Sequence, residues 1–314
     1  MSSLLQVNGL TKIFHTKKLF RQAHSFVAVN NISFTVNEGE IVGILGPNGA
    51  GKSTTIQMLL GTLTPTSGTI TYFGKNLERH HTQVMEQVGY ATGYARFPSR
   101  LTVRENLRIV GALYGLSQEK SDERIEQLIE AFHVGWLADK MVRGLSAGQM
   151  TRIMLAKAFL ASPKIVLLDE PTASLDPDVV EIIRHFLIEQ KEKYKTAMLL
   201  ASHDMDEVAH VCDRVLILKN GSIIATDTPE QLAATVSTSV LKFTVTSGKR
   251  ELIELLDAQH MKFKINENAV AIELDEKELS LFLQQCAQHS ILYSHIVLEK
   301  PTLEDYFLNI ARSK

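Results

Sequence analysis

The feature that most constrains this chain is a glycine-rich run, which lies between a strand-like and a helix-like segment. Residues 40–45 are mostly apolar and predict a buried strand, and residues 54–60 show helical spacing of apolar side chains. Glycines let backbone amides turn toward an anion, and the N-terminus of the following helix adds partial positive charge. The strand–turn–helix context therefore predicts a phosphate-binding P-loop. Its residues are Gly46, Pro47, Asn48, Gly49, Ala50, Gly51, Lys52, Ser53 and Thr54.

Two side chains of this loop carry the expected chemistry. Lys52 is predicted to reach the β- and γ-phosphates of a nucleotide as a point charge, and the Ser53 hydroxyl to ligate Mg²⁺. A glycine-rich surface turn is the plain alternative, which the flanking strand and helix disfavour. The loop alone leaves kinases, GTPases and motor ATPases open.

Acidic and imidazole side chains follow two further apolar runs. Asp169 and Glu170 come after the run 165–168, and His203 comes after the run 197–201. Such runs are typical of strands buried on both faces, and an open α/β sheet places its ligand chemistry at the carboxyl ends of its strands. Asp169 is predicted to hold Mg²⁺, Glu170 to act as general base on the attacking water, and His203 to contact the γ-phosphate. An acidic turn and a structural histidine are the alternatives.

A second glycine-containing helix start lies at residues 145–149, before the helical pattern 150–160. Like the P-loop, it offers a helix N-terminus that can bind phosphate. A plain helix start with Ser146 as its N-cap explains the same residues.

Taken in order, these motifs resemble those of the ATP-binding subunit of ABC transporters, over residues from about 4 to 235. The resemblance implies a head-to-tail homodimer in which each ATP lies between one copy's P-loop and the other's signature segment. It places an adenine-stacking aromatic at Phe14, for which a core phenylalanine is the alternative. The signature residues are then Leu145, Ser146, Ala147, Gly148 and Gln149, and the D-loop residues are Ser174, Leu175 and Asp176.

Two positions depart from the family pattern. Ala147 replaces a usual glycine, a change of one methyl group that we expect to be tolerated. Gly93 stands where the family has a glutamine that ligates Mg²⁺ and couples to the membrane subunit. We hypothesise that water or the Thr92 hydroxyl takes that ligand position.

The strand and helix patterns predict two domains. Residues 1–235 are expected to form an α/β P-loop NTPase core, with a parallel sheet, an antiparallel β subdomain and a helical subdomain at about 92–160. In the helical part, Thr102 and Glu105 predict a capping box. Residues 239–314 follow a βαββαβ order, which predicts a small α+β ferredoxin-like domain. The segment 15–24 is predicted to be a solvated loop, with contact to lipid headgroups or a partner as the alternative.

Charge and hydropathy limit the partners. The formal net charge of −2 gives no global field toward nucleic acid or an anionic membrane, and no nucleic-acid partner is expected. No run approaches 18 apolar residues, and the N-terminus lacks the pattern of a secretion signal. We therefore expect a cytoplasmic protein, and the resemblance implies that it lies peripherally on the inner face of the plasma membrane.

The segment 297–307 resembles the ending of bacterial drug- and polysaccharide-exporter ATPases, the ABC-2 group. That resemblance implies ATP and Mg²⁺ as cofactors and a separate integral membrane subunit. The expected function is ATP hydrolysis that drives an exporter. An importer ATPase with a ligand-sensing C-terminal domain is the alternative. A soluble ABC ATPase acting on ribosomes or DNA is disfavoured, because the chain shows neither basic excess nor heptads.

Overall fold

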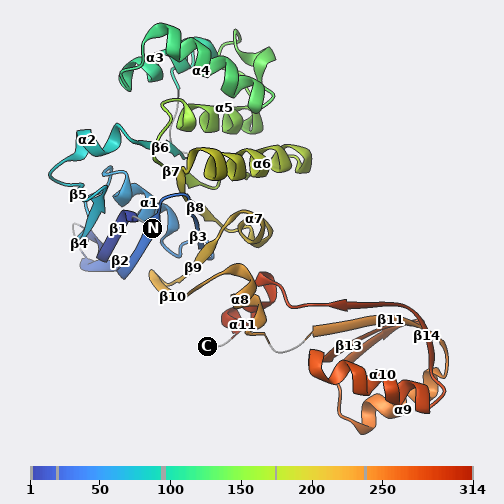
Figure 1. Cartoon of the computed structure of the whole chain (residues 1–314). Coiled ribbons are helices and arrows are strands. Elements are labelled where there is room, and N and C mark those ends of the chain that lie inside the picture. Colours follow the sequence, from blue (N-terminus) through green and yellow to red (C-terminus); the bar gives the residue numbers. More distant parts are fainter. Residues whose placement is uncertain (1–2, 19–20, 93–96, 174, 237–238, 313–314) are drawn as a thin grey trace. The chain divides into compact units, whose positions relative to one another are not determined.

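The chain divides into two compact units, Met1–Thr228 and Pro229–Lys314. The computed structural model describes residues 3–18, 21–92, 97–173, 175–236 and 239–312 (Figure 1). The predicted boundary lay later, between residues 235 and 239. The difference arises because α8 (Pro229–Ala234) packs against α11 (Leu303–Arg312), so that α8 belongs to the second unit.

Six strands form the larger sheet of the first unit: β3 (Ile41–Leu45), β6 (Val88–Ala91), β7 (Ile165–Asp169), β8 (Ala197–Ser202), β9 (Arg214–Lys219) and β10 (Ser222–Asp227). The order is β10-β9-β3-β8-β7-β6, and only the β9–β10 pair is antiparallel. β3, β7 and β8 are buried along their whole length, as expected of strands covered on both faces. The predicted parallel sheet is confirmed.

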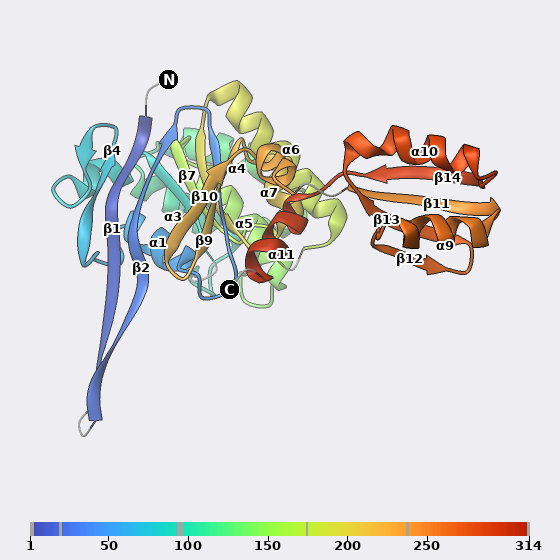
Figure 2. The ribbon, with the colours of Figure 1, turned by 90° about the horizontal axis from the view of Figure 1, so that it is seen from below.

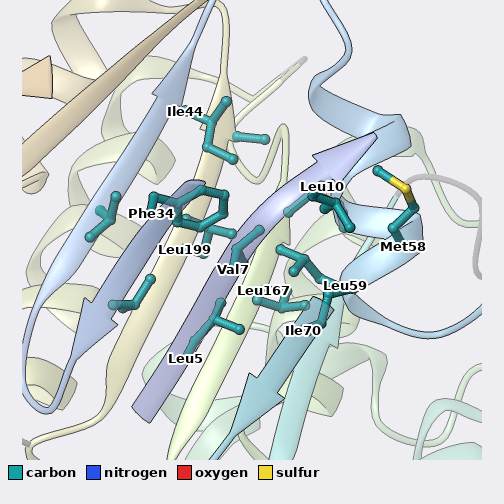
Figure 3. Packing of buried hydrophobic residues seen from close by; sticks show 14 of the residues in the cluster. Leu5, Val7, Leu10, Phe34, Ile44, Met58, Leu59, Ile70, Leu167 and Leu199 are labelled. Carbon is teal, nitrogen blue, oxygen red and sulfur yellow. The ribbon is translucent and has the colours of Figure 1, made fainter. Parts of the chain in front are cut away.

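A second, antiparallel sheet has the order β2-β1-β4-β5. Its strands are β1 (Ser3–Lys18), β2 (Arg21–Asn37), β4 (Ser67–Tyr72) and β5 (Lys75–Asn76). Helix α1 (Lys52–Leu59) packs against both β2 and the strands β7 and β8. Leu5 and Leu10 of the small sheet, Met58 of α1 and Leu167 and Leu199 of the large sheet therefore share one core (Figure 3).

The hairpin of β1 and β2 corrects one expectation. Residues 15–24 were predicted to form a loop, but β1 continues to Lys18 and β2 begins at Arg21. The two strands run on together beyond β4 (Figure 2). The pairs Phe14–Phe26 and His15–Ser25 keep them in register, so the added residues lengthen the strands.

The helical subdomain lies beyond β6 and β7 (Figure 1) and contains α3 (Val103–Leu113), α4 (Gln118–Ala131), the short η1 (Gly135–Leu137) and α5 (Ala147–Phe159). Thr102 caps α3, and Glu105 closes the predicted capping box by accepting from the Thr102 amide at 2.8 Å. Three other helices surround the large sheet: α2 (His81–Met85), α6 (Pro177–Tyr194) and α7 (Met205–Val211). Among the helices described, none is both long and apolar enough to cross a membrane.

The second unit contains a four-stranded antiparallel sheet of order β12-β13-β11-β14. Its elements are β11 (Ser239–Ser247), α9 (Lys249–Ala258), β12 (Phe263–Asn266), β13 (Ala269–Leu274), the short η2 (Glu276–Glu278), α10 (Leu279–Gln288) and β14 (Leu292–Glu299). Both α9 and α10 cover one face of this sheet (Figure 1). The βαββαβ order is the one the sequence pattern predicts.

Candidate active site

The predicted chemistry gathers at the carboxyl ends of three neighbouring strands. The P-loop follows β3, Asp169 ends β7 and Glu170 follows it, and His203 follows β8. In the sheet β8 lies between β3 and β7 and is parallel to both. The three segments therefore meet at one edge of the sheet.

The P-loop backbone is shaped by two close approaches. A Cβ at Gly46 would lie 2.3 Å from the Leu218 carbonyl oxygen, and a Cβ at Gly51 would lie 2.5 Å from that of Ala28. Gly51 also has a φ of 109°, a conformation that a side chain disfavours. Pro47, Asn48 and Gly49, at the tip, are exposed, while Ala50 and Gly51 are buried. The loop is thus packed at its ends and open at its tip, where an anion would bind.

Lys52 is nearly buried, with 6% of its surface exposed. Its Nζ donates to the Gly46 carbonyl at 2.6 Å and lies 3.6 Å from Glu170 Oε1. The Lys52 ammonium therefore lies between the start of the P-loop and the acidic end of β7. From this position it can neutralise the charge of a bound phosphate.

Ser53 and Asp169 lie side by side, because the Ser53 hydroxyl donates to Asp169 Oδ1 at 3.3 Å. Burial raises the pKa of Asp169, the Ser53 hydrogen bond opposes this, and the Glu170 charge adds to the rise. A cation beside this carboxylate would favour its ionised form. The two oxygens thus suit a hard cation such as Mg²⁺, which prefers oxygen ligands and keeps several waters.

Glu170 is held by His203, whose Nδ1 lies 2.7 Å from Glu170 Oε2. Glu170 also has a φ of 54°, a conformation rarely adopted by residues other than glycine. Its amide donates to the Ala201 carbonyl at 2.8 Å. Backbone strain of this kind is concentrated at functional sites, and here it sets the direction of a carboxylate that is 28% exposed. A partly exposed carboxylate with a fixed direction can accept a proton from water.

Glu207, on α7, is a buried acid behind this site that the sequence analysis missed. It has no exposed surface, and its Oε2 accepts from the Ser202 hydroxyl at 2.7 Å. Burial raises its pKa, and the hydroxyls of Ser202 and Thr172 oppose the rise. Ser202 in turn accepts from the Asp204 amide, so Glu207 fixes the turn that carries His203. The sequence signal that could have indicated this acid is its position in the first turn of a helix, three residues after Asp204, the N-cap of α7.

Lys157, on α5, is a second buried charge that the sequence analysis missed. Its Nζ donates to the Tyr90 carbonyl at 2.9 Å and lies over the Tyr90 ring, 3.2 Å from its centroid. Burial lowers the pKa of Lys157 to about 7. Lys157 therefore links the helix that follows the signature segment to β6.

The signature segment begins α5. Ser146 is the N-cap, and Gln149 completes a capping box by accepting from the Ser146 amide at 3.0 Å. The plain helix start is therefore present. Ser146 and Ala147 are exposed, whereas Leu145, Gly148 and Gln149 are partly covered. Contact of this helix start with a nucleotide stays a prediction.

Two motif residues lie outside the described part of the chain, namely Ser174 of the D-loop and Gly93 at the expected glutamine position. Their neighbours are described. Asp176 is the N-cap of α6, and Leu175 donates its amide to the Thr172 carbonyl. Thr92 and Asp169 both line a hollow of about 460 Å³.

Phe14 is 40% exposed on β1 and pairs across the hairpin with Phe26. Lys12 Nζ lies 5.2 Å from the centroid of the Phe14 ring. The exposure disfavours a core phenylalanine. An exposed ring can stack on a planar base, and this role stays a prediction.

Comparisons with known proteins agree with this geometry. A family model described as ABC transporter matches residues 29–173. The chain is 35% identical to the uncharacterized ABC transporter ATP-binding protein YxlF of Bacillus subtilis, over 91% of this chain and 95% of the relative. It is 36% identical to the lipopolysaccharide export system ATP-binding protein LptB of Haemophilus influenzae, over 73% of this chain and 92% of the relative.

Solved structures show the same fold. A structure of the ATP-binding subunit of an ABC transporter has a TM-score of 0.65 at 29% identity, over 74% of this chain and 92% of the other. A dimeric ATP-binding cassette bound to ADP and Pi has the same TM-score at 24% identity, over 71% of this chain and 98% of the other.

Proposed function

Because the chain belongs to the family of ABC transporter ATP-binding proteins, we propose that it is the ATPase motor of an exporter whose membrane-spanning part is a separate subunit. The observation that carries the motor role is the meeting of Lys52, Glu170 and His203 at one sheet edge. Export is supported by the likeness to a lipopolysaccharide export ATPase.

ATP would bind with its phosphates on the P-loop. Lys52 neutralises charge on the β- and γ-phosphates, and backbone amides at the start of α1 surround them. Ser53 and Asp169 would hold Mg²⁺, which would neutralise phosphate charge when bound. The exposed ring of Phe14 would stack on the adenine.

Hydrolysis needs a base that removes a proton from the attacking water. Glu170 has the position and the exposure for this role. His203 holds the Glu170 carboxylate through Nδ1 and would contact the γ-phosphate through its other ring nitrogen.

The motor would work as a head-to-tail homodimer. The exposed start of α5, at Ser146 and Ala147, would close over the ATP of the other copy. The D-loop residues Leu175 and Asp176 would lie at the same interface.

The membrane subunit would dock on the hollow of about 460 Å³. Its apolar lining includes Leu60, Met85 and Tyr114, and it extends to Thr92 and Asp169. A partner seated there would touch the catalytic edge and the strand before Gly93. The protein would then lie in the cytoplasm, on the inner face of the plasma membrane.

The decisive experiment reconstitutes the chain with its membrane subunit in vesicles and supplies Mg-ATP on the side where the ATPase is bound. Export predicts substrate movement away from the ATPase side, at a rate that Glu170→Gln abolishes. Movement toward the ATPase side would contradict the exporter assignment and leave the motor role intact.

A further inference from the structure

The open face of the C-terminal sheet carries a hollow of about 660 Å³ that the ATPase chemistry does not use. Helices α9 and α10 pack on the opposite face, through residues such as Leu252 and Phe282. The hollow is lined by side chains from all four strands, including Lys242, Thr244, Lys264, Asn266, Ala271 and His295.

The strand register explains the shape of this hollow. Ala271 of β13 pairs with Lys264 of β12 on one side and with Lys242 of β11 on the other. In the next row on that face, Ala269 lies between Asn266 and Thr244. Neighbouring strands are about 4.8 Å apart, so each alanine leaves a gap roughly two strand spacings wide between longer side chains. The floor of the hollow is therefore formed by small alanine side chains, and its walls are formed by longer side chains that carry hydrogen-bond donors.

An irregularity in β14 brings a histidine to the same place. Between the pairs Lys242–Val297 and Thr244–Ser294, β11 advances two residues and β14 advances three. His295 lies in this bulge with a φ of 53°, and it lines the hollow. Bulges often redirect a side chain at a functional site, and strained non-glycine residues are concentrated at such sites.

The charge of the lining is one-sided. It contains Lys242, Lys264 and His295 and no carboxylate. Lys264 forms no ion pair within the described residues, whereas Lys242 contacts Glu299 at 2.7 Å. Both side chains of that ion pair are half-exposed, so the pair contributes little stabilising free energy, and an arriving anion can compete with Glu299 for Lys242. The nearby Glu273 faces Lys262, at 3.8 Å.

We propose that this hollow binds a small soluble anion bearing carboxylate or phosphate groups, as a site separate from the P-loop. Lys264 and Lys242 bind the anion from two sides, and the Thr244 hydroxyl, the Asn266 amide and the His295 ring donate hydrogen bonds. The volume is sufficient for a metabolite of several carbon atoms.

The test follows the ring signals of His295 by NMR in the full chain, assigned with His295→Gln, during titration with citrate and with inorganic phosphate at constant ionic strength. A saturable shift is expected. Lys264→Met should raise the half-saturating concentration about tenfold, and Lys264→Arg should change it less than about threefold. Lys262→Met is the matched control, because Lys262 is close in the chain but does not line the hollow. The Lys52→Ala chain should titrate as the native chain does, since its defect is confined to the P-loop.

Three outcomes would overturn the proposal. The first is the lack of a saturable shift with either anion. The second is an equal loss of anion affinity in Lys262→Met and Lys264→Met, which would show that the anion responds to the general positive charge of the surface. The third is a response only to vesicles containing phosphatidylglycerol, which would identify a lipid headgroup as the ligand.

Discussion

Glu170 Oε2 and His203 Nδ1 lie 2.7 Å apart, across the ends of two neighbouring parallel strands. The two side chains thus come from segments 33 positions apart in the chain. Their contact depends on the register of β7 and β8, in which Asp169 pairs with Ala201.

The first prediction concerns Glu170→Gln. The amide keeps the shape of the side chain but cannot accept the proton, so hydrolysis should fall by about 10²- to 10⁴-fold while ATP binding is retained. Steady-state phosphate release and nucleotide binding measure the two effects. Lys52→Ala is the contrasting variant, because it should weaken binding itself. Near-normal turnover of Glu170→Gln would remove Glu170 from the role of base.

The second prediction compares the effect on stability of replacing two P-loop glycines, Gly49 and Gly51, by alanine. Gly51→Ala places a Cβ at a φ of 109° and 2.5 Å from a backbone oxygen, whereas at Gly49, with a φ of 80°, nothing lies within 4 Å. Gly49→Ala should therefore cost roughly 1–2 kcal/mol of unfolding free energy, and Gly51→Ala more than that. Gly135→Ala is the control, since Gly135 has neither a positive φ nor a close neighbour. Equal stability of all three variants in denaturant unfolding would contradict this reading of the loop.

The third prediction concerns the pH dependence at Lys157. Its pKa is about 7 in the folded chain against an ordinary 10.5. Between these values the unfolded chain holds a proton that the folded chain has lost, so the free energy of unfolding should rise as pH rises from about 7 to about 10.5. Lys157→Met should lack this rise, and urea unfolding of both chains across that range measures the difference. Parallel curves would show that Lys157 keeps an ordinary pKa.

The fourth prediction concerns Glu207. Burial raises its folded pKa above the ordinary 4.5, so its contribution to stability should decline as pH rises from about 4.5 through the folded pKa. Glu207→Gln should remove this decline and keep the bond to Ser202. Glu207→Ala should also lower kcat by about ten- to a hundredfold, because the turn carrying His203 loses its support. Equal kcat in the Ala and Gln variants would contradict a positioning role.

The fifth prediction concerns the second unit. Removal of residues 229–314 should leave ATP binding intact, because none of the ATP motifs lies there. We expect it to weaken self-association, since pairing of these units would keep two ATPase units at high effective concentration. Light scattering with and without ATP measures the mass of both chains. Identical association of the full and shortened chains would contradict this role.

The positions of Asp169, Glu170 and His203 could be predicted because each lies within two residues of the end of an unbroken apolar run. Asp169, Glu170 and His203 take their places once β7 and β8 enter a parallel sheet. The same local logic predicts the capping box of α3, whose partners are three residues apart, and the N-cap Ser146 of α5.

Burial of single charged residues could not be predicted in the same way. Lys157 and Glu207 lie on helices whose sequences also carry polar residues that are at least partly exposed, such as Arg152 and Asp206, and only their packing against other elements buries them. The extended hairpin was missed because the segment 15–24 is rich in basic and polar residues, which also occur in loops. The boundary at Thr228 depends on the packing of α8 against α11, elements about 70 residues apart.

The packing of α8 against α11 means that the second unit begins and ends at nearly the same place. A unit with adjoining ends can be gained, lost or exchanged between genes through one joint, with little disturbance to its own fold. The ATPase unit and the C-terminal unit could thus have separate evolutionary histories. In practical terms, a fluorophore placed on α11 would report from the unit's point of entry.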